Sequence, residues 1–252
     1  MGALNDRLIQ HAGTLDEVWL PWLARQRIAR VPIDVLCGGA DRLVVIAPHP
    51  DDEILACGGL LAMCSAIGMN LLVIALTDGE ASHGFIDAEA KSNLALIRIE
   101  ESSLGLLALG VRPESVLRLH VADGDVVSNV HDISMRIQQV LRPSDLVITT
   151  WSLDGHPDHE AASVAAQLAC DHLKCRLLQA PVWMWHWATP DHANVPWSNL
   201  RALDLPEWAV RGKHKALLCH HSQLKARSGH QPPVLIPSIV ERSMRPQEYY
   251  FQ

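Results

Sequence analysis

The stretch VVIAPHPDDEILACGG, residues 44–59, runs from an apolar segment directly into a cluster of polar side chains. Continuous apolar residues are typical of a strand that is buried on both faces. Asp51, Asp52 and Glu53 follow at once, and three adjacent carboxylates repel one another unless a positive charge lies among them. A bound divalent cation would offset this repulsion. The stretch therefore predicts a buried strand that leads into a charged, functional loop.

Short apolar runs alternate with longer amphipathic runs on both sides of this stretch. The strand-like runs are residues 43–47, 71–76, 115–119, 145–150 and, more weakly, 176–182. Helical patterns lie between them at 53–67, 88–109, 127–141 and 159–173. This alternation is typical of a parallel sheet that is covered by helices on both faces. We therefore expect an α/β fold with a mostly parallel sheet.

The two ends of the chain depart from this pattern. Residues 14–30 have the spacing of an extra N-terminal amphipathic helix, with Thr14 as its N-cap. Residues 183–206 are rich in Trp and Pro and predict a long loop, followed by a helix at 206–220 and an irregular or extended tail at 231–252. Since no linker or internal repeat interrupts the chain, we expect residues 1–252 to form a single domain.

Composition narrows the class of protein. The chain has 252 residues, of which 48% are hydrophobic and 19% charged, as in an ordinary globular protein. The net charge of −7 argues against a nucleic-acid surface, which normally needs a basic stripe. The six cysteines form no CxxC pair and are expected to be free thiols in a reducing compartment. No apolar signal core and no transmembrane segment is evident, so a soluble, cytoplasmic protein is expected.

Polar clusters follow each of the first four predicted strands. They comprise residues 49–53, 77–83, 120–125 and 154–159. Ligands of open parallel sheets bind outside the carboxyl ends of the strands. The four clusters are therefore expected to line one site.

Two pairs in these clusters have an i,i+3 spacing: His49 with Asp52, and His156 with His159. At a strand-to-helix junction, such a pair can direct both side chains to one point. Two imidazoles and one carboxylate with an open position are typical of a catalytic zinc site. The alternative is that Asp52 or Asp158 simply caps the following helix. Two His-Pro-Asp segments that each follow an apolar strand favour the metal site.

The sequence resembles the PIG-L/LmbE-like zinc N-deacetylases, which remove acetyl groups from N-acetylglucosamine-type sugars. The resemblance covers about residues 40–225 and rests mainly on PHPDDE (48–53) and HPDH (156–159). Weaker matches are TDGEASHG (77–84), RIEESSLGLLALGV (98–111), ADGD (122–125) and KALLCHHSQ (215–223). The resemblance implies a Rossmann-like fold of three α/β/α layers. It also implies one zinc ion per chain, held by His49, Asp52 and His159, with other divalent metals as alternatives, and Asp51 as the catalytic base.

Further roles follow for the neighbouring residues. His156 is placed to stabilise an oxyanion if it is protonated. Asp158 is expected either to orient His156 or to support the metal site. Arg98 and Asp123 resemble positions at which family members hold sugar hydroxyls, although Arg98 has an ion pair with Glu101 as an alternative.

The predicted function is a zinc-dependent hydrolase that removes an acetyl group from an N-acetylglucosamine-type amino sugar or its conjugate. The alternatives are a non-catalytic metal- or metabolite-binding protein, and a hydrolase of another amide or of an ester. Asp51 favours catalysis, because a binding site needs no free carboxylate beside the metal. The expected partner is a small amino-sugar substrate, and a homo-oligomer remains open.

The tryptophan-rich segment leaves two interpretations open. Trp183, Trp185 and Trp187 alternate and would share one face of an extended segment. That face would serve either as a platform on which a sugar ring stacks or as a ridge that packs against the core.

Overall fold

The computed structural model describes residues 9, 13–84, 86–227 and 231–252. An eight-stranded sheet has the order β1-β7-β8-β6-β5-β2-β3-β4. Its strands are β1 (Ala29–Arg30), β2 (Arg42–Ala47), β3 (Asn70–Thr77), β4 (Val116–Val121), β5 (Asp145–Thr150), β6 (Arg176–Ala180), β7 (Leu200–Asp204) and β8 (Gln247–Phe251). All paired strands are parallel except β8, which runs antiparallel to both of its neighbours. The expectation of a mostly parallel sheet is confirmed.

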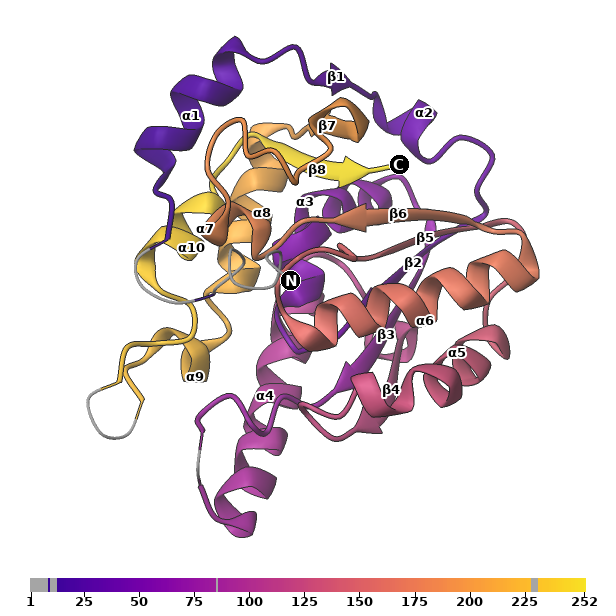
Figure 1. The fold of residues 1–252 in the computed structure, drawn as a ribbon. Coiled ribbons are helices and arrows are strands. Elements are labelled where there is room, and N and C mark those ends of the chain that lie inside the picture. The colour runs from indigo at the N-terminus through magenta and orange to yellow at the C-terminus, as the bar shows by residue number, and fades with distance from the viewer. Residues whose placement is uncertain (1–8, 10–12, 85, 228–230) are drawn as a thin grey trace.

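Helices cover both faces of this sheet (Figure 1). They are α1 (Asp16–Arg25), α2 (Ile33–Leu36), α3 (Asp52–Ala66), α4 (Ala88–Ala108), α5 (Val130–Gln138), α6 (Pro157–Leu173), α7 (Met184–Trp187), α8 (Glu207–Leu217), α9 (His221–Leu224) and α10 (Pro237–Arg242). Short 3₁₀ turns are η1 (Pro113–Ser115), η2 (Val127–Asn129) and η3 (Trp197–Asn199).

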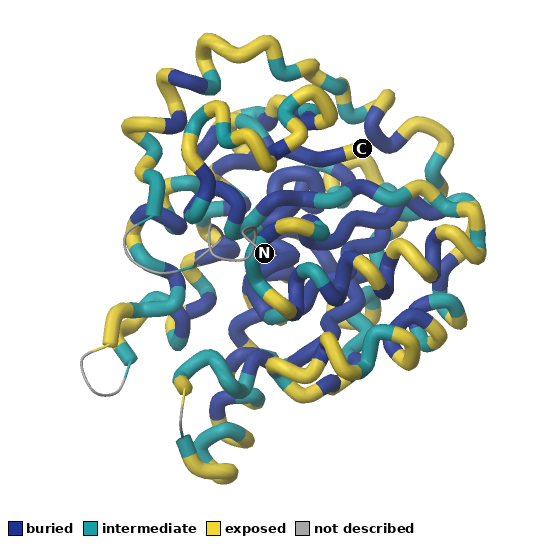
Figure 2. The backbone as a smooth tube through the Cα atoms, in the orientation of Figure 1, coloured by how far each residue is buried: buried dark blue, intermediate teal, exposed yellow. Residues whose placement is uncertain are grey.

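Strand β2 shows why three layers form. Every residue from Leu43 to Ala47 is buried (Figure 2). Because successive side chains point to opposite faces, Leu43 and Val45 pack with α3 and α8, whereas Val44 and Ile46 pack with α5 and α6. A strand with two apolar faces needs helices on both sides, so the three-layer α/β/α prediction is confirmed.

The two ends of the chain are more regular than expected. The segment 183–206 is not one long loop, because it contains α7, η3 and β7. The tail forms α10 and β8, and β8 lies inside the sheet between β7 and β6. The N-terminal helix begins at Asp16 with Leu15 as its N-cap, so the capping role expected for Thr14 is wrong. Thr14 Oγ1 instead donates to Ala188 O at 2.6 Å.

Helix α3 is interrupted by a kink at Cys57, where φ is −151° and ψ is 28°. The N–H groups that the kink frees at Gly59 and Leu60 donate to the carboxylate of Glu248 in β8, at 2.7 and 2.9 Å. Lys213 Nζ also donates to Glu248 at 2.7 Å. A Cβ at Gly59 would lie 2.5 Å from Leu205 Cδ1, so only glycine allows this close packing.

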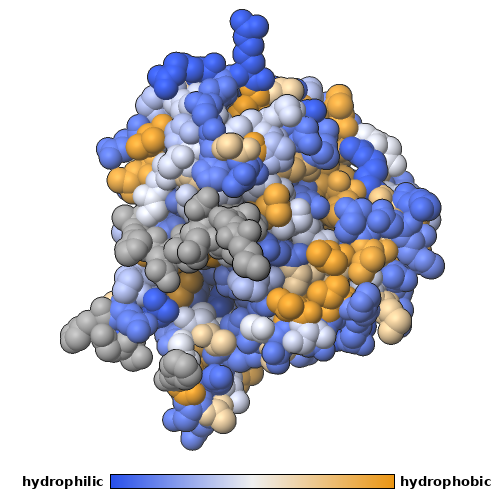
Figure 3. Space-filling view, viewed as in Figure 1, coloured by the Kyte–Doolittle hydropathy of each residue, from blue (hydrophilic) through white to orange (hydrophobic). Residues whose placement is uncertain are grey.

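The outer surface carries hydrophobic residues over α6 (Figure 3). Val164 is 47% exposed and Leu168 is 39% exposed.

All six cysteines are free, as expected. None of the helices in the described part of the chain combines the length and the apolarity that a membrane span requires.

Candidate active site

The polar segments that follow β2, β3, β4 and β5 meet at the carboxyl-terminal edge of the sheet. They border a cavity of about 490 Å³. The predicted site residues that line it are His49, Asp51, Asp52, Arg98, Asp123, His156 and His159. Asp158 is buried directly behind them, 3.2 Å from His49. The sequence therefore identified residues that the fold brings together.

Asp52 lies at the centre of the candidate metal ligands. Its Oδ2 is 3.1 Å from His49 Nδ1 and 3.1 Å from His159 Nε2. Each of the residues His49, His156 and His159 offers a ring nitrogen, and these nitrogens lie within 4.8 Å of one another. Neither Asp52 nor Asp158 caps its helix with its side chain, because Asp52 Oδ2 accepts from His49 N and α6 is capped by His156.

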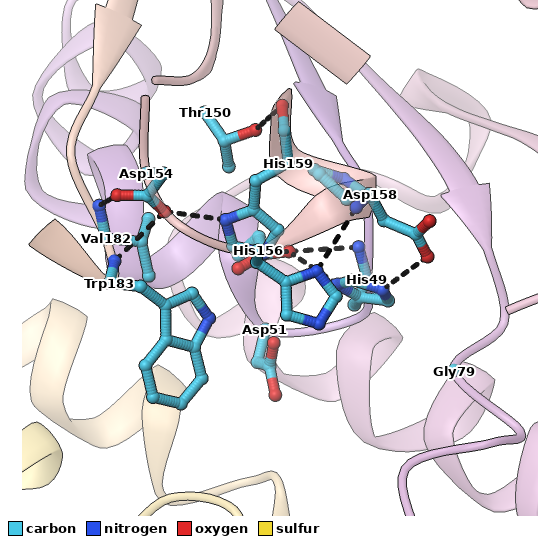
Figure 4. A network of polar contacts seen from close by, with 12 residues as sticks. His49, Asp51, Gly79, Thr150, Asp154, His156, Asp158, His159, Val182 and Trp183 are labelled. Carbon is cyan, nitrogen blue, oxygen red and sulfur yellow. Dashed lines mark hydrogen bonds and ion pairs between the residues drawn. The ribbon is translucent and has the colours of Figure 1, made fainter. Parts of the chain in front are cut away.

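His159 is held by a carboxylate that sequence reasoning left without a role. Asp154, which is fully buried, lies 2.7 Å from His159 Nδ1 (Figure 4). The backbone N–H groups of Val182, Trp183 and Met184 donate to the same carboxylate at 2.9–3.0 Å. With its proton on Nδ1, His159 directs the lone pair of Nε2 toward Asp52. Such orientation of a ligand by a second carboxylate is common in metal sites.

The chemistry of these donors fits a divalent cation. His159 Nε2 is buried and makes no hydrogen bond to any residue that the structure describes, although Asp52 Oδ2 lies beside it. Burial lowers the pKa of His159, but Asp52 and Asp154 outweigh burial and raise the pKa to about 9. A positive charge is therefore favoured between His159 and Asp52, and a metal ion can supply it in place of a proton.

His49 is surrounded by carboxylates. Its Nε2 is 3.2 Å from Asp123 Oδ1 and 3.2 Å from Asp158 Oδ2. Burial lowers the pKa of His49, but the hydrogen bonds with Asp123, Asp158 and Asp52 raise it well above the usual value. Asp158 also accepts from Gly124 N at 2.9 Å. Of the two roles expected for Asp158, its side chain is placed for the support of a candidate ligand, His49, and not for the orientation of His156.

Asp51 has an unusual backbone conformation. Its φ is 132°, a region that residues with a Cβ rarely adopt. Its N–H donates to Glu53 Oε2 at 3.0 Å, and Glu53 in turn accepts from Ser102 Oγ at 2.9 Å. Arg98 Nη2 donates to Asp51 Oδ2 at 3.1 Å. Burial raises the pKa of Asp51 to about 7, although Arg98 acts in the opposite direction.

Arg98 is buried and connects three segments of the site. It donates to Pro50 O at 2.7 Å and to Gly79 O at 2.8 Å, besides its bond with Asp51. The expected alternative of an ion pair with Glu101 is wrong, because Glu101 accepts from Ser222 N and Ser222 Oγ instead.

Asp123 is anchored while it borders the cavity. It accepts from Ala81 N at 2.8 Å and lies beside His49. The substrate-binding roles of Arg98 and Asp123 stay predictions, but both side chains line the cavity.

His156 differs from the expectation in its charge. Burial, together with the charges of His159 and His49, lowers its pKa to about 3. Its Nδ1 accepts from Asp158 N at 3.3 Å, which places the ring proton on Nε2. The neutral ring can therefore still donate a hydrogen bond from Nε2, and the expected requirement for a protonated His156 is not met.

Comparisons with known proteins agree with this geometry. The family model described as PIG-L, GlcNAc-PI de-N-acetylase, matches residues 44–170. The chain is 32% identical over 129 residues to the diacetylchitobiose deacetylase of Thermococcus kodakarensis, a match that covers 48% of this chain and 46% of the relative. It is 30% identical over 203 residues to the 1D-myo-inositol 2-acetamido-2-deoxy-alpha-D-glucopyranoside deacetylase of Mycolicibacterium gilvum, which covers 66% of this chain and 69% of that relative.

Solved structures share the fold. A structure of the zinc-inhibited form of a teicoplanin deacetylase has a TM-score of 0.63 at 16% identity and covers 83% of this chain and 97% of its own. The N,N'-diacetylchitobiose deacetylase of Pyrococcus horikoshii has a TM-score of 0.56 at 20% identity, with coverages of 86% and 82%. The match with the Thermococcus relative spans less than half of that protein, at 46%. The family model and the Mycolicibacterium relative together show that this chain belongs to the PIG-L family.

Proposed function

We propose that this chain is a zinc-dependent N-deacetylase that hydrolyses the acetamido group of an N-acetylglucosamine-type sugar or its conjugate. One observation carries the proposal: Asp51, a carboxylate outside the candidate ligand set, faces the same cavity as His49, Asp52 and His159. The relatives in Thermococcus kodakarensis and Mycolicibacterium gilvum are named as deacetylases of acetamido sugars, which supports the substrate class.

His49, Asp52 and His159 would hold the metal. Two imidazoles and one carboxylate, with a further position open, suit zinc. When bound, zinc lowers the pKa of a coordinated water and polarises an amide carbonyl. Asp154 and Asp158 would keep the two imidazoles in the orientation that ligation requires.

The remaining residues have separate tasks. Asp51 would take a proton from the attacking water and deliver it to the leaving amine, as a general base and then a general acid. Arg98 holds Oδ2 of Asp51, so the proton would be carried on Oδ1. His156 would donate from Nε2 to the oxygen on which negative charge develops. Asp123, together with Arg98, would bind sugar hydroxyls at the rim of the cavity.

The alternatives have less support from the site. A protein that only binds a metabolite has no use for a buried, strained carboxylate such as Asp51, which costs about 1–3 kcal/mol to hold. A phosphoester would need cations, and the two arginines of the described lining, Arg98 and Arg227, both donate to backbone carbonyls.

The test is amine release from N-acetylglucosamine conjugates by the zinc-loaded protein. We expect Asp51→Asn to keep one zinc per chain and the native melting temperature but to lose about 10²–10⁴-fold in kcat, as expected when a general base is neutralised. His159→Ala should lose the zinc. Near-normal turnover of Asp51→Asn, or full zinc content of His159→Ala by elemental analysis, would contradict the assignment.

A further inference from the structure

The cavity has two chemically different sides. The candidate metal ligands and Asp51 form one side, at the ends of β2 and β5. The rest of the described lining is mostly apolar, although Ser82, His186 and Arg227 also border the cavity. The members that we call the apolar wall are Leu55, Trp183, Pro232, Pro233, Val234, Leu235, Ile236 and Ile239. Trp183, labelled in Figure 4, lines the same cavity as His156 and Asp51, and its backbone N–H donates to Asp154, which also contacts the candidate ligand His159.

The apolar wall is fixed to the rest of the molecule. Leu235 is buried, and its N–H donates to the carbonyl of the buried Gln223 at 3.0 Å. Arg227 Nε donates to Pro232 O at 2.8 Å, and its Nη1 donates to Ser82 O at 3.1 Å. These bonds connect the segment 232–236 to the loop that follows β3. The wall is therefore preformed, as is usual for small-molecule sites.

The chemistry of the wall selects an uncharged ligand. The segment PPVLI, residues 232–236, carries no charged side chain and two prolines without N–H donors. Arg227, at its edge, already binds two backbone carbonyls. Apolar side chains that border open space of this size lower the free energy when an apolar group covers them. A sugar ring with its hydroxyls suits the opposite, polar side better.

We propose that the apolar wall binds an apolar, uncharged aglycone, of alkyl or aryl type, attached to the N-acetylglucosamine unit. This inference rests on the proposed function. If the group removed is acetyl, the acyl part contributes a single methyl group, which is too small to cover the wall. The cavity of about 490 Å³ is in the range that holds drug-sized ligands. The polar side then binds the sugar and its amide, and the wall binds the group at the sugar's anomeric position.

The experiment compares two substrates that differ only in the aglycone, octyl and methyl N-acetylglucosaminide, with the zinc-loaded full chain. Each buried methylene contributes about fourfold in affinity, equivalent to about 0.8 kcal/mol. Because not all of the octyl chain will be covered, we expect kcat/KM for the octyl glycoside to exceed that for the methyl glycoside by at least about tenfold.

A pair of matched variants locates the effect. Val234→Ser places a hydroxyl on the wall at a half-buried position. Val240→Ser makes the same change six residues further along, in α10, at a half-buried position outside the cavity lining. We expect Val234→Ser to reduce the octyl-to-methyl ratio of kcat/KM severalfold, because the hydroxyl makes the wall a poorer surface for the alkyl chain. Val240→Ser should keep the wild-type ratio.

The outcomes separate this inference from the proposed function. Equal kcat/KM for the two glycosides would overturn the aglycone site while the deacetylase activity stands. The wild-type protein could instead prefer methyl N-octanoylglucosaminide over methyl N-acetylglucosaminide and lose this preference in Val234→Ser. That result would assign the wall to the acyl chain and would also overturn the aglycone site.

Calorimetric binding of the product, octyl glucosaminide, needs no turnover. Suppose that neither glycoside is hydrolysed, so that the proposed function fails. If octyl glucosaminide then binds more tightly than methyl glucosaminide, and Val234→Ser weakens this binding, the wall would still be supported as an aglycone site. Equal affinity for octyl and methyl glucosaminide would overturn the aglycone site.

Discussion

Asp51 combines the proposed general base with a backbone conformation suited to glycine. A φ of 132° brings the Cβ into steric conflict with the backbone, and such strain costs about 1–3 kcal/mol. The bonds from Asp51 N to Glu53 and from Arg98 to Asp51 hold the conformation. The strain aims the carboxylate into the cavity instead of along α3.

Two substitutions that both remove this carboxylate isolate the strain. We expect Asp51→Gly to be more stable than Asp51→Ala by about 1–3 kcal/mol, because only glycine adopts this φ without conflict. This reverses the usual order, in which glycine is the less stable. Urea unfolding of the two inactive variants measures the difference. A less stable glycine variant would show that the backbone at residue 51 is not strained.

Asp154 shows what residue-level sequence reasoning can and cannot find. The i,i+3 spacing after an apolar strand is a local signal, and it paired His49 with Asp52 and His156 with His159. The family resemblance then implied His49, Asp52 and His159 as the ligands. The partners of Asp154 are backbone N–H groups at 182–184, about 30 residues away, and no local sequence pattern predicts that contact. Its place in the loop that ends with HPDH was the only sequence signal.

Replacing Asp154 should weaken the metal site without removing a ligand. Asn at this position can neither accept all the N–H groups of residues 182–184 nor hold the proton of His159 Nδ1 as strongly. We expect Asp154→Asn to lower zinc affinity by about 10- to 100-fold in a chelator competition. The control is Asp171→Asn at an exposed position of α6, which should retain wild-type affinity. Unchanged affinity of Asp154→Asn would remove Asp154 from the metal site.

At the scale of elements, the C-terminal strand was predicted only in part, because the tail 231–252 was expected to be irregular or extended but not to join the sheet. β8 has the sequence QEYYF, in which Glu248 interrupts an apolar strand pattern. The carboxylate is buried because it caps the second half of α3 and pairs with Lys213, contacts that span 189 and 35 residues. A strand whose buried charge is satisfied only by distant elements has no local signature. The regular strands β2, β3 and β5 have one, and their predicted bounds agree within one residue.

The tryptophan segment was assigned to the wrong element. Met184–Trp187 form the short helix α7, with Trp183 as its N-cap, and not an extended segment, so the three tryptophan side chains do not share one face. Trp185 is buried, with its ring centroid 5.1 Å from that of Trp19 and 5.0 Å from that of Tyr249. For Trp185 the structure favours packing, the second of the two interpretations. Trp183 instead lines the cavity.

Substitution of Trp185 should therefore affect mainly stability, whereas substitution of Trp183 should affect mainly substrate binding. Trp185→Ala leaves a hole between α1, α7 and β8 and is expected to lower the free energy of unfolding by about 3–5 kcal/mol. Trp183→Ala should change stability less and should raise KM for the octyl glycoside. Thermal melting and steady-state kinetics of both variants test this. A Trp185→Ala variant with wild-type stability and a raised KM would contradict the packing role and support the alternative, in which a sugar ring stacks on Trp185.

At the scale of the whole molecule, the periodic apolar strands and helices from residue 42 to 180 were predictable, because each carries its own pattern. Their order in the sheet was not, because β5 lies beside β2 and not beside β4. The sheet is then extended by β8, β7 and β1, whose order does not follow the chain.

Among the polar groups enclosed by this packing is His220, which is fully buried after α8. Its Nδ1 lies 3.3 Å from Leu217 O, and its Nε2 has no hydrogen-bond partner within the described part of the chain.

This burial predicts how stability depends on pH. Burial, followed by the charge of Arg98, lowers the pKa of His220 from 6.5 to about 4. Between these values the unfolded chain binds a proton at this residue and the folded chain does not, so the free energy of unfolding falls as the pH falls. The full effect of one such group is about 3 kcal/mol, and it is complete below about pH 4.

The test compares wild type with His220→Asn by urea unfolding at several pH values from 7 to 4. The variant is expected to be less stable at pH 7, because its amide buries further polar atoms, but to lose less stability on acidification. Only the difference between the two slopes reports on His220, since the carboxylates of the molecule titrate in both proteins. Parallel slopes would mean that His220 takes up its proton in the folded state as readily as in the unfolded chain, which a fully enclosed imidazole beside Arg98 should not do.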